Sequence, residues 1–216
     1  MTTARSTISR GDRIALIVIA VGALLLAAAA LVGIVVQAVT ISSATSLEIG
    51  GLALGNATSP EFLAPFASVT DARYESVSLT LADPPTQVRW LHWATVLCSG
   101  LITAGTAGSV AWLAGRTARG RPFVRSATIA VMATAIIVLV CGLVGDACEG
   151  MTRFEVVSLL GPDAAAHGDG AGTHEGFTAA LFESSLASIG WGLGLAVVAQ
   201  VLRIGERMQK DTEGLV

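Results

Sequence analysis

Four long stretches without a formally charged residue constrain this chain more than any other feature of its sequence. Asp, Glu, Lys and Arg are absent from residues 14–36, 90–115, 126–145 and 184–202. A helix needs about 20 consecutive apolar residues to cross the hydrocarbon core of a bilayer, and each stretch reaches or approaches that length. The sequence therefore predicts an all-α integral membrane protein, built as a four-helix bundle.

The boundaries of these stretches divide the chain into spans and loops within a single membrane domain, residues 1–216. We expect spans at about 14–40, 91–114, 126–146 and 177–203, with long loops at about 41–90 and 147–176. The first stretch is about twice as long as the apolar core of a signal peptide, which has about 7–15 residues. We therefore interpret it as a retained helix.

The composition supports a membrane protein and excludes other classes. Hydrophobic residues make up 53% of the 216 residues and charged residues 13%, whereas soluble domains carry about 25% charged residues. The formal net charge of -3 argues against direct nucleic-acid binding, which requires a basic surface. A total of 3 cysteines is too few for a disulfide scaffold. The sequence does not decide whether Cys98, Cys141 and Cys148 pair.

The distribution of basic residues predicts the orientation in the membrane. Ten of the 13 Lys and Arg residues lie in the N-terminal tail, in the loop between the second and third spans, or in the C-terminal tail. Loops rich in Lys and Arg stay in the cytoplasm. We therefore expect both termini in the cytoplasm and the two long loops outside.

The first long loop contains a pattern typical of a β-strand. Residues 74–81 alternate in polarity, which places Val77, Leu79 and Leu81 on one face. Residues 47–54 and 87–90 are predicted to pair with this strand. We expect a small extracellular β-element in the first outer loop.

Small residues recur at helical spacing on two spans, and two explanations stay open. Such stripes allow close approach of helix backbones in a membrane. We favour packing inside the bundle, with a homo-oligomer face as the alternative. The stripes are Gly100, Ala104 and Gly108 on the second span, and Gly190 with Gly194 and Ser184, Ser188 and Gly192 on the fourth.

Ionisable residues near the outer ends of the spans are candidates for a binding site. Charged groups at membrane depth are costly and often functional. Five such residues fall at a similar outer level, namely Glu183, Asp146, Glu149, His92 and Arg89. They are predicted to bind a cation or relay a proton, or else to form structural ion pairs near the headgroups.

The second long loop holds imidazole and carboxylate groups at His167, Asp169 and His174. Such groups bind divalent metals, but their spacing matches neither a zinc motif nor an i,i+4 pair on a helix. We expect a solvated loop without a metal, with these residues as the metal-binding alternative. No catalytic constellation or cofactor motif occurs, so we expect neither enzyme activity nor a cofactor.

Two cytoplasmic segments carry a family resemblance. The sequence Gly-Arg-Pro-Phe at residues 120–123 and the tail residues Gly205, Gln209 and 211–216 are similar to motifs of the DUF2975 family, although Met208 stands where Leu is usual. The resemblance implies a bacterial inner-membrane protein with four spans, often encoded beside a small helix-turn-helix regulator. The resemblance assigns no functional residue. From their residue types, these segments either end helices and set the topology or form a docking surface for a cytoplasmic protein. The docking candidates are Gly120, Arg121, Pro122, Phe123, Asp211, Glu213 and Val216.

Two functions follow as hypotheses. The first is a non-enzymatic inner-membrane protein that acts as an interaction or sensory partner of a cytoplasmic regulator. The alternative is a small transporter or ligand-binding bundle that uses Glu183 and the nearby outer polar residues. A third hypothesis, a role in the cell envelope, places the activity in the β-containing loop. The identity of the ligand or partner and the oligomeric state are not encoded in any recognisable motif.

Overall fold

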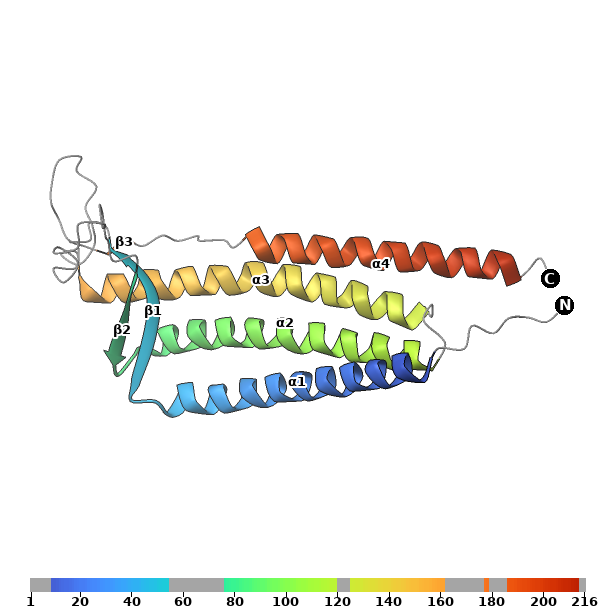
Figure 1. Cartoon of the computed structure of the whole chain (residues 1–216). Coiled ribbons are helices and arrows are strands. Elements are labelled where there is room, and N and C mark those ends of the chain that lie inside the picture. The colour runs from blue at the N-terminus through green and yellow to red at the C-terminus, as the bar shows by residue number, and fades with distance from the viewer. Residues whose placement is uncertain (1–8, 55–75, 120–124, 162–176, 179–185, 214–216) are drawn as a thin grey trace, which may run out of the picture. The chain divides into compact units, whose positions relative to one another are not determined.

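The computed structural model describes residues 9–54, 76–119, 125–161, 177–178 and 186–213. In chain order the elements are α1 (Arg10–Ser43), β1 (Ser46–Leu54), β2 (Ser76–Ala82), α2 (Thr86–Ala118), α3 (Arg125–Leu160), β3 (Phe177–Thr178) and α4 (Leu186–Glu213) (Figure 1). All 4 helices are long and apolar enough to cross a membrane. The prediction of a mostly helical, multi-pass membrane protein is therefore confirmed.

The chain divides into two compact units. The helical unit comprises Met1–Val36, Val96–Val144 and Ser185–Val216, and the sheet unit comprises Gln37–Thr95 and Gly145–Ser184. The helical unit therefore contains most of the apolar residues of the four helices. The sheet unit takes the strands together with the end of α1, the start of α2 and the end of α3.

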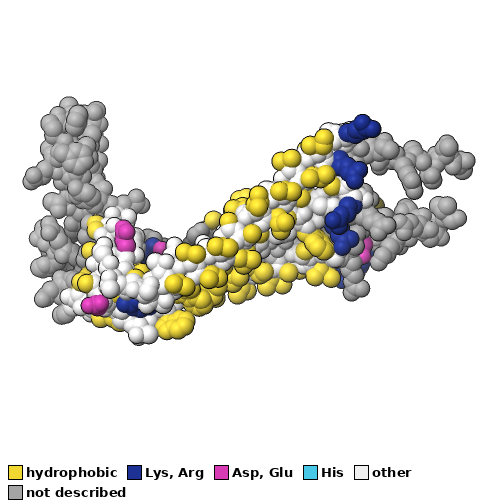
Figure 2. All heavy atoms as spheres, turned by 90° about the horizontal axis from the view of Figure 1, so that it is seen from below, with side chains coloured by type: hydrophobic (Ala, Val, Ile, Leu, Met, Phe, Trp, Pro, Cys, Tyr) yellow, Lys and Arg dark blue, Asp and Glu magenta, His cyan; other side chains and the backbone are white. Residues whose placement is uncertain are grey.

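The helical unit buries small side chains and exposes large ones. Its buried positions include Ala107, Ala135 and Ala199, whereas Leu24 and Val35 are 62% and 64% exposed. Exposed hydrophobic side chains run along the helices in Figure 2. Soluble proteins bury their large aliphatic residues, while membrane helices pack through small ones and turn large ones toward lipid. The burial pattern is that of helices surrounded by lipid.

Close contacts in the helical unit join helices that are consecutive in the chain. Gly100 of α2 lies against the side chain of Ile34 of α1, and Gly142 of α3 lies against Ser188 of α4. A Cβ atom built on Gly192 would lie 3.1 Å from Cβ of Leu139. The stripes at Gly100 and at Ser188 with Gly192 thus pack inside the unit. Cβ atoms built on Gly108, Gly190 and Gly194 would meet nothing within 4 Å among the described residues.

A pair of hydroxyl groups joins α2 and α3 in the helical unit. The Ser109 and Thr134 hydroxyls share a short hydrogen bond, and Thr134 also donates to the backbone oxygens of Ala130 at 3.0 Å and Gly105 at 3.3 Å. Thr134 is buried, and a buried hydroxyl requires such partners. Cys98, Cys141 and Cys148 all lie in described helices, and no disulfide joins any two of them.

The sheet has the strand order β2-β1-β3, with both pairings antiparallel. The β1–β2 register places Leu47 opposite Leu81, Ile49 opposite Leu79 and Leu52 opposite Val77. This pairing confirms the prediction that residues 47–54 pair with the alternating strand, whose first residues, 74–75, lie outside the described residues. The register shifts between Ile49 and Leu52, so that Leu47, Ile49 and Leu52 are all buried despite their spacing.

Gly51 makes that register shift sterically feasible. Its φ angle is 75°, a conformation that Gly adopts readily and other residues rarely. A left-handed Gly is characteristic of a β-bulge, which inserts one extra residue and reverses the alternation of side chains. The bulge therefore brings Leu52 onto the face that carries Leu47 and Ile49.

Three element boundaries differ from the expectations. Residues 87–90, predicted to pair as a strand, lie at the start of α2. Pro84 and Pro85 stand just before this helix, where the N–H group that proline lacks would have no helical hydrogen-bond partner. Helix α3 continues past residue 146 to Leu160, where Val156 and Val157 are buried. Phe177, expected to begin the fourth span, lies in β3, and the described part of α4 begins at Leu186.

Candidate functional site

The guanidinium group of Arg89 caps the C-terminal end of α1. Nη1 donates to the carbonyl oxygens of Ile41 at 2.9 Å, Ala44 at 2.8 Å and Ser42 at 3.5 Å, and Nε donates to that of Pro84 at 3.0 Å. The last carbonyl groups of a helix lack partners within the helix and form the negative end of its dipole. Arg89 thus joins the first turn of α2 to the last turn of α1.

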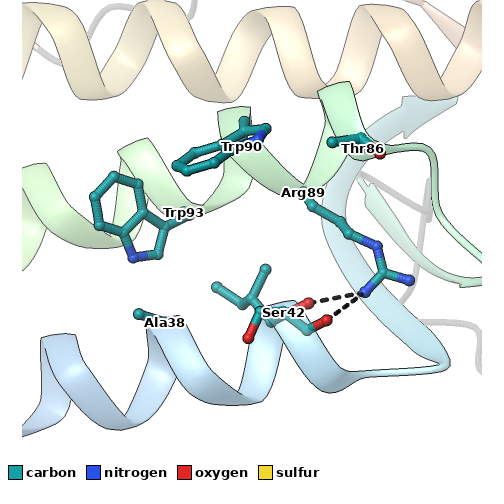
Figure 3. Close-up of a pocket in the computed structure, with 7 residues that line it drawn as sticks. Ala38, Ser42, Thr86, Arg89, Trp90 and Trp93 are labelled. Carbon is teal, nitrogen blue, oxygen red and sulfur yellow. Dashed lines mark hydrogen bonds between the residues drawn. The ribbon is translucent and has the colours of Figure 1, made fainter.

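A groove opens beside this cap, and we call it the Arg89 groove (Figure 3). Its volume is about 500 Å³, and it is lined by Ala38, Ile41, Ser42, Thr86, Arg89, Trp90 and Trp93. The two indole rings stand edge to face at 88°, with centroids 5.6 Å apart. Trp90 is 64% exposed. The buried indole nitrogen of Trp93 has no hydrogen-bond partner among the described residues.

A second, smaller cavity of about 140 Å³ lies in the sheet unit, and we call it the His92 pocket. It is lined by Ile49, Gly50, His92, Thr95, Glu149, Thr152 and Arg153. Arg153 and Glu149, one turn apart on α3, form an ion pair with a separation of 2.5 Å. The buried Thr152 hydroxyl donates to the carbonyl oxygen of Cys148 at 2.7 Å. The pocket thus combines an imidazole, a carboxylate and a guanidinium.

Gly51 gives the Arg153 side chain its position beside the pocket. A Cβ atom built on Gly51 would lie 2.5 Å from Nη2 and 2.9 Å from Cζ of Arg153. The guanidinium therefore lies directly against the backbone of the bulge. The same glycine provides both the positive φ angle of the strand and the space for this cation.

The predicted outer cluster separates into two places. His92 and Glu149 line the His92 pocket, whereas Arg89 lines the Arg89 groove. Asp146 lies on α3 but is not among the lining residues of either cavity. Glu183 lies outside the described residues. The structure therefore brings together two of the five predicted binding residues.

Most of the other predicted site residues lie where the structure gives no side chain. Gly120, Arg121, Pro122, Phe123 and Val216 lie outside the described residues, as do His167, Asp169 and His174. Asp211 and Glu213 belong to α4, although only their backbone is described. Within the described ranges, no group of three or more His, Cys, Asp and Glu residues is positioned to hold a metal.

Sequence reasoning missed several residues that form the two cavities. The sequence analysis selects neither Trp93 nor Thr152, Arg153 and Gly51 as site residues. Arg153 and Glu149 had a detectable signal, because oppositely charged residues at i,i+4 face each other on a helix. The signal for Gly51 was the Gly-Gly pair inside a strand, which often marks a bulge.

Basic side chains gather at one end of the helices (Figure 2). In the last turn of α2, the Arg116 guanidinium lies over the Trp112 ring, 4.8 Å from its centroid. Helix α4 continues beyond Arg203 through a charged segment to Glu213. In this segment Ile204 is 57% exposed and Met208 is 65% exposed.

Comparisons with protein families, curated proteins and solved structures find no match to this chain. The similarity to DUF2975 therefore stays a prediction.

Proposed function

We propose that this chain is a non-enzymatic bacterial inner-membrane protein that acts as an interaction or sensory partner of a cytoplasmic protein. The observation that supports this function most directly is the continuity of α4. One helix runs from the apolar stretch at Leu186 through the charged segment to Glu213. A displacement of α4 in the membrane would therefore be transmitted mechanically to its charged end.

The proposed orientation places both termini in the cytoplasm. Arg10 and Arg13 lie in the first turn of α1, while Arg116 and Arg119 lie at the end of α2. An antiparallel succession of spans brings these residues to the same side as Arg203 on α4. Because Lys and Arg near span ends favour the cytoplasmic side, this arrangement supports the orientation.

The charged end of α4 has the composition of a docking helix. Ile204 and Met208 are exposed one turn apart, beside the exposed basic residues Arg203 and Arg207. Asp211 and Glu213 follow on the same helix. Apolar anchors at i,i+4 spacing, flanked by charges, are typical of helices that bind a groove on a partner protein. The DUF2975-like tail motif supports the same assignment.

Crosslinking in native bacterial membranes, followed by affinity purification and mass spectrometry, tests this function. We expect a stoichiometric cytoplasmic partner that is lost when residues 211–216 are deleted or Met208 is changed to Glu. Deletion of residues 2–7 is the matched control and should leave the partner in place. Recovery of the same partner with both α4 variants would contradict a docking role for this segment.

The His92 pocket favours a second candidate function, the binding of a small ligand or cation outside the membrane. An imidazole and a carboxylate that share one cavity are a plausible cation or proton site. We propose that Glu183 contributes to it. Stabilisation of the purified protein by Na⁺, Mg²⁺ or Zn²⁺ chloride, measured by thermal unfolding, should disappear in Glu183→Gln and Glu149→Gln. It should persist in Glu48→Gln, and an unchanged stabilisation in all three variants would contradict the proposal.

A further inference from the structure

We propose that the Arg89 groove binds an anionic phospholipid, with its phosphate at Arg89 and an acyl chain between α1 and the two indole rings. This site is distinct from the docking segment of α4 and from the His92 pocket. The inference goes beyond the proposed function, since it assigns a bound lipid to a part of the chain that neither candidate function uses.

The charge of Arg89 is the first support. Its hydrogen bonds to described residues run from Nε and Nη1 to backbone carbonyl oxygens, which carry no formal charge. Among the described residues, neither a carboxylate nor any other acceptor contacts Nη2. A half-buried cation without a counter-ion is unfavourable at the edge of a bilayer. The N–H groups of Nη2 can donate charge-assisted hydrogen bonds to a phosphate, so a phospholipid headgroup supplies the missing charge.

The shape and lining of the groove are the second support. Its volume of about 500 Å³ lies within the range of about 300–1,000 Å³ found for small-molecule sites. Ala38, Ile41 and the faces of Trp90 and Trp93 provide apolar walls, and Arg89 provides the charge at one end (Figure 3). An apolar slot with a cation at its end is complementary to an acyl chain with an anionic headgroup.

The position of the groove along the helices is the third support. Ala38 lies near the C-terminal end of α1, and Trp90 and Trp93 lie in the first turns of α2. Indole rings are enriched at the boundary between hydrocarbon and water. Figure 3 shows the indole nitrogen of Trp93 on the side of the ring that faces α1. The groove therefore lies at the level where a phospholipid headgroup meets its acyl chains.

Quenching by brominated lipids tests the proposal on the full chain. Changing Trp112 and Trp191 to Phe leaves Trp90 and Trp93 as the only tryptophans, whose emission is followed under selective tryptophan excitation. The protein is reconstituted into phosphatidylcholine vesicles that contain either brominated phosphatidylglycerol or brominated phosphatidylcholine. Because one charge-assisted hydrogen bond corresponds to about a tenfold change in affinity, we expect half-maximal quenching at about tenfold less phosphatidylglycerol than phosphatidylcholine.

Two variants and a matched control locate the effect. Arg89→Gln removes the cation, and Ala38→Phe fills the groove while leaving the hydrogen bonds of Arg89 intact. Both should abolish the preference for phosphatidylglycerol, and the second should do so without lowering the unfolding temperature. Arg116→Gln removes a cation at the other end of α2, far along the helix from both remaining tryptophans, and should change nothing.

Three outcomes would overturn the proposal. Equal quenching by the two brominated lipids means that only nonspecific boundary lipid contacts the indole rings. An equal loss in Arg116→Gln assigns the preference to overall charge. Displacement by soluble glycerophosphoglycerol, which lacks acyl chains, assigns the groove to a water-soluble headgroup ligand instead of a lipid.

Discussion

Ser188 of α4 occupies the space that a side chain on Gly142 of α3 would fill. The Cβ atom and hydroxyl of Ser188 lie so close to the Gly142 backbone that even one added methyl group collides with them. A membrane interface without water depends on such close packing, because lipid provides no hydrophobic force that drives helices together. This pair therefore positions α4 on α3.

Gly142→Ala should lower the free energy of unfolding in detergent by about 1–3 kcal/mol, the usual cost of overpacking. Gly190→Ala is the matched control, because a Cβ atom there meets nothing within 4 Å among the described residues and Ala is the better helix former. We expect its unfolding temperature to be unchanged or raised. Ser188→Gly should restore stability when it is combined with Gly142→Ala. Equal unfolding temperatures of the Gly142→Ala and Gly190→Ala variants would contradict this account of α3–α4 packing.

Adjacent glycines in β1 should respond differently to the same substitution. Gly51→Ala forces a left-handed backbone, at a cost of about 1–2 kcal/mol, and its Cβ atom also collides with the guanidinium of Arg153. Gly50→Ala places its Cβ atom in open space. Thermal unfolding followed by circular dichroism should show a loss of stability for Gly51→Ala alone. Arg153→Ala should relieve only the collision, so a full rescue would show that the φ angle of Gly51 is unimportant.

The hydroxyl pair between α2 and α3 should contribute modestly to stability. Thr134→Val keeps the side-chain volume but removes the hydrogen bonds to Ser109 and Gly105, and such bonds in membranes average about 0.6 kcal/mol, with a maximum of about 1.7 kcal/mol. Thr103→Val is the control, since its hydroxyl bonds only to Ser99 on its own helix. A double-mutant cycle with Ser109→Ala measures the coupling energy, and a value of zero would remove this pair from the interface.

The proposed topology gives a further test. A green fluorescent protein fused after Val216 should fluoresce, because the C-terminus is expected in the cytoplasm, where this reporter folds. Alkaline phosphatase fused after Leu160 should be active, because this position is expected outside, whereas a fusion after Arg119 should be inactive. Activity at Arg119 together with inactivity at Leu160 would reverse the orientation and place the tail of α4 outside the cell.

The sequence predicted the number of helices and one strand pairing, but hydropathy alone could not give the helix ends. The length of a charge-free stretch indicates which part of a helix can lie in lipid. It does not indicate how far the helix continues beyond the lipid. Helix α3 therefore extends past Asp146 to Leu160, where Val156 and Val157 are buried in the sheet unit. A run as short as residues 87–90 does not distinguish a strand from a helix by its pattern.

The sequence predicted the level of the candidate site residues along their helices. It did not predict which neighbouring helix each side chain faces. Arg89 and His92 were expected at one level, and both lie near the start of α2. They nevertheless line different cavities, one beside α1 and the other beside α3. Sequence distance fixes the rise along a helix, whereas the neighbour that a side chain meets depends on packing. The groove beside Trp93 has no sequence motif, because it arises between residues 38–42 of α1 and residues 86–93 of α2, which β1 and β2 separate in the sequence.

The contacts described in the helical unit all join neighbours in the chain, and this has a consequence for biogenesis. Helix α1 exposes large apolar side chains around most of its circumference, so it can enter the bilayer alone as it leaves the ribosome. Each later helix then finds its docking surface already inserted, with Gly100 meeting Ile34 first and Ser188 meeting Gly142 last. For the contacts described, assembly can therefore follow the order in which the helices are synthesised.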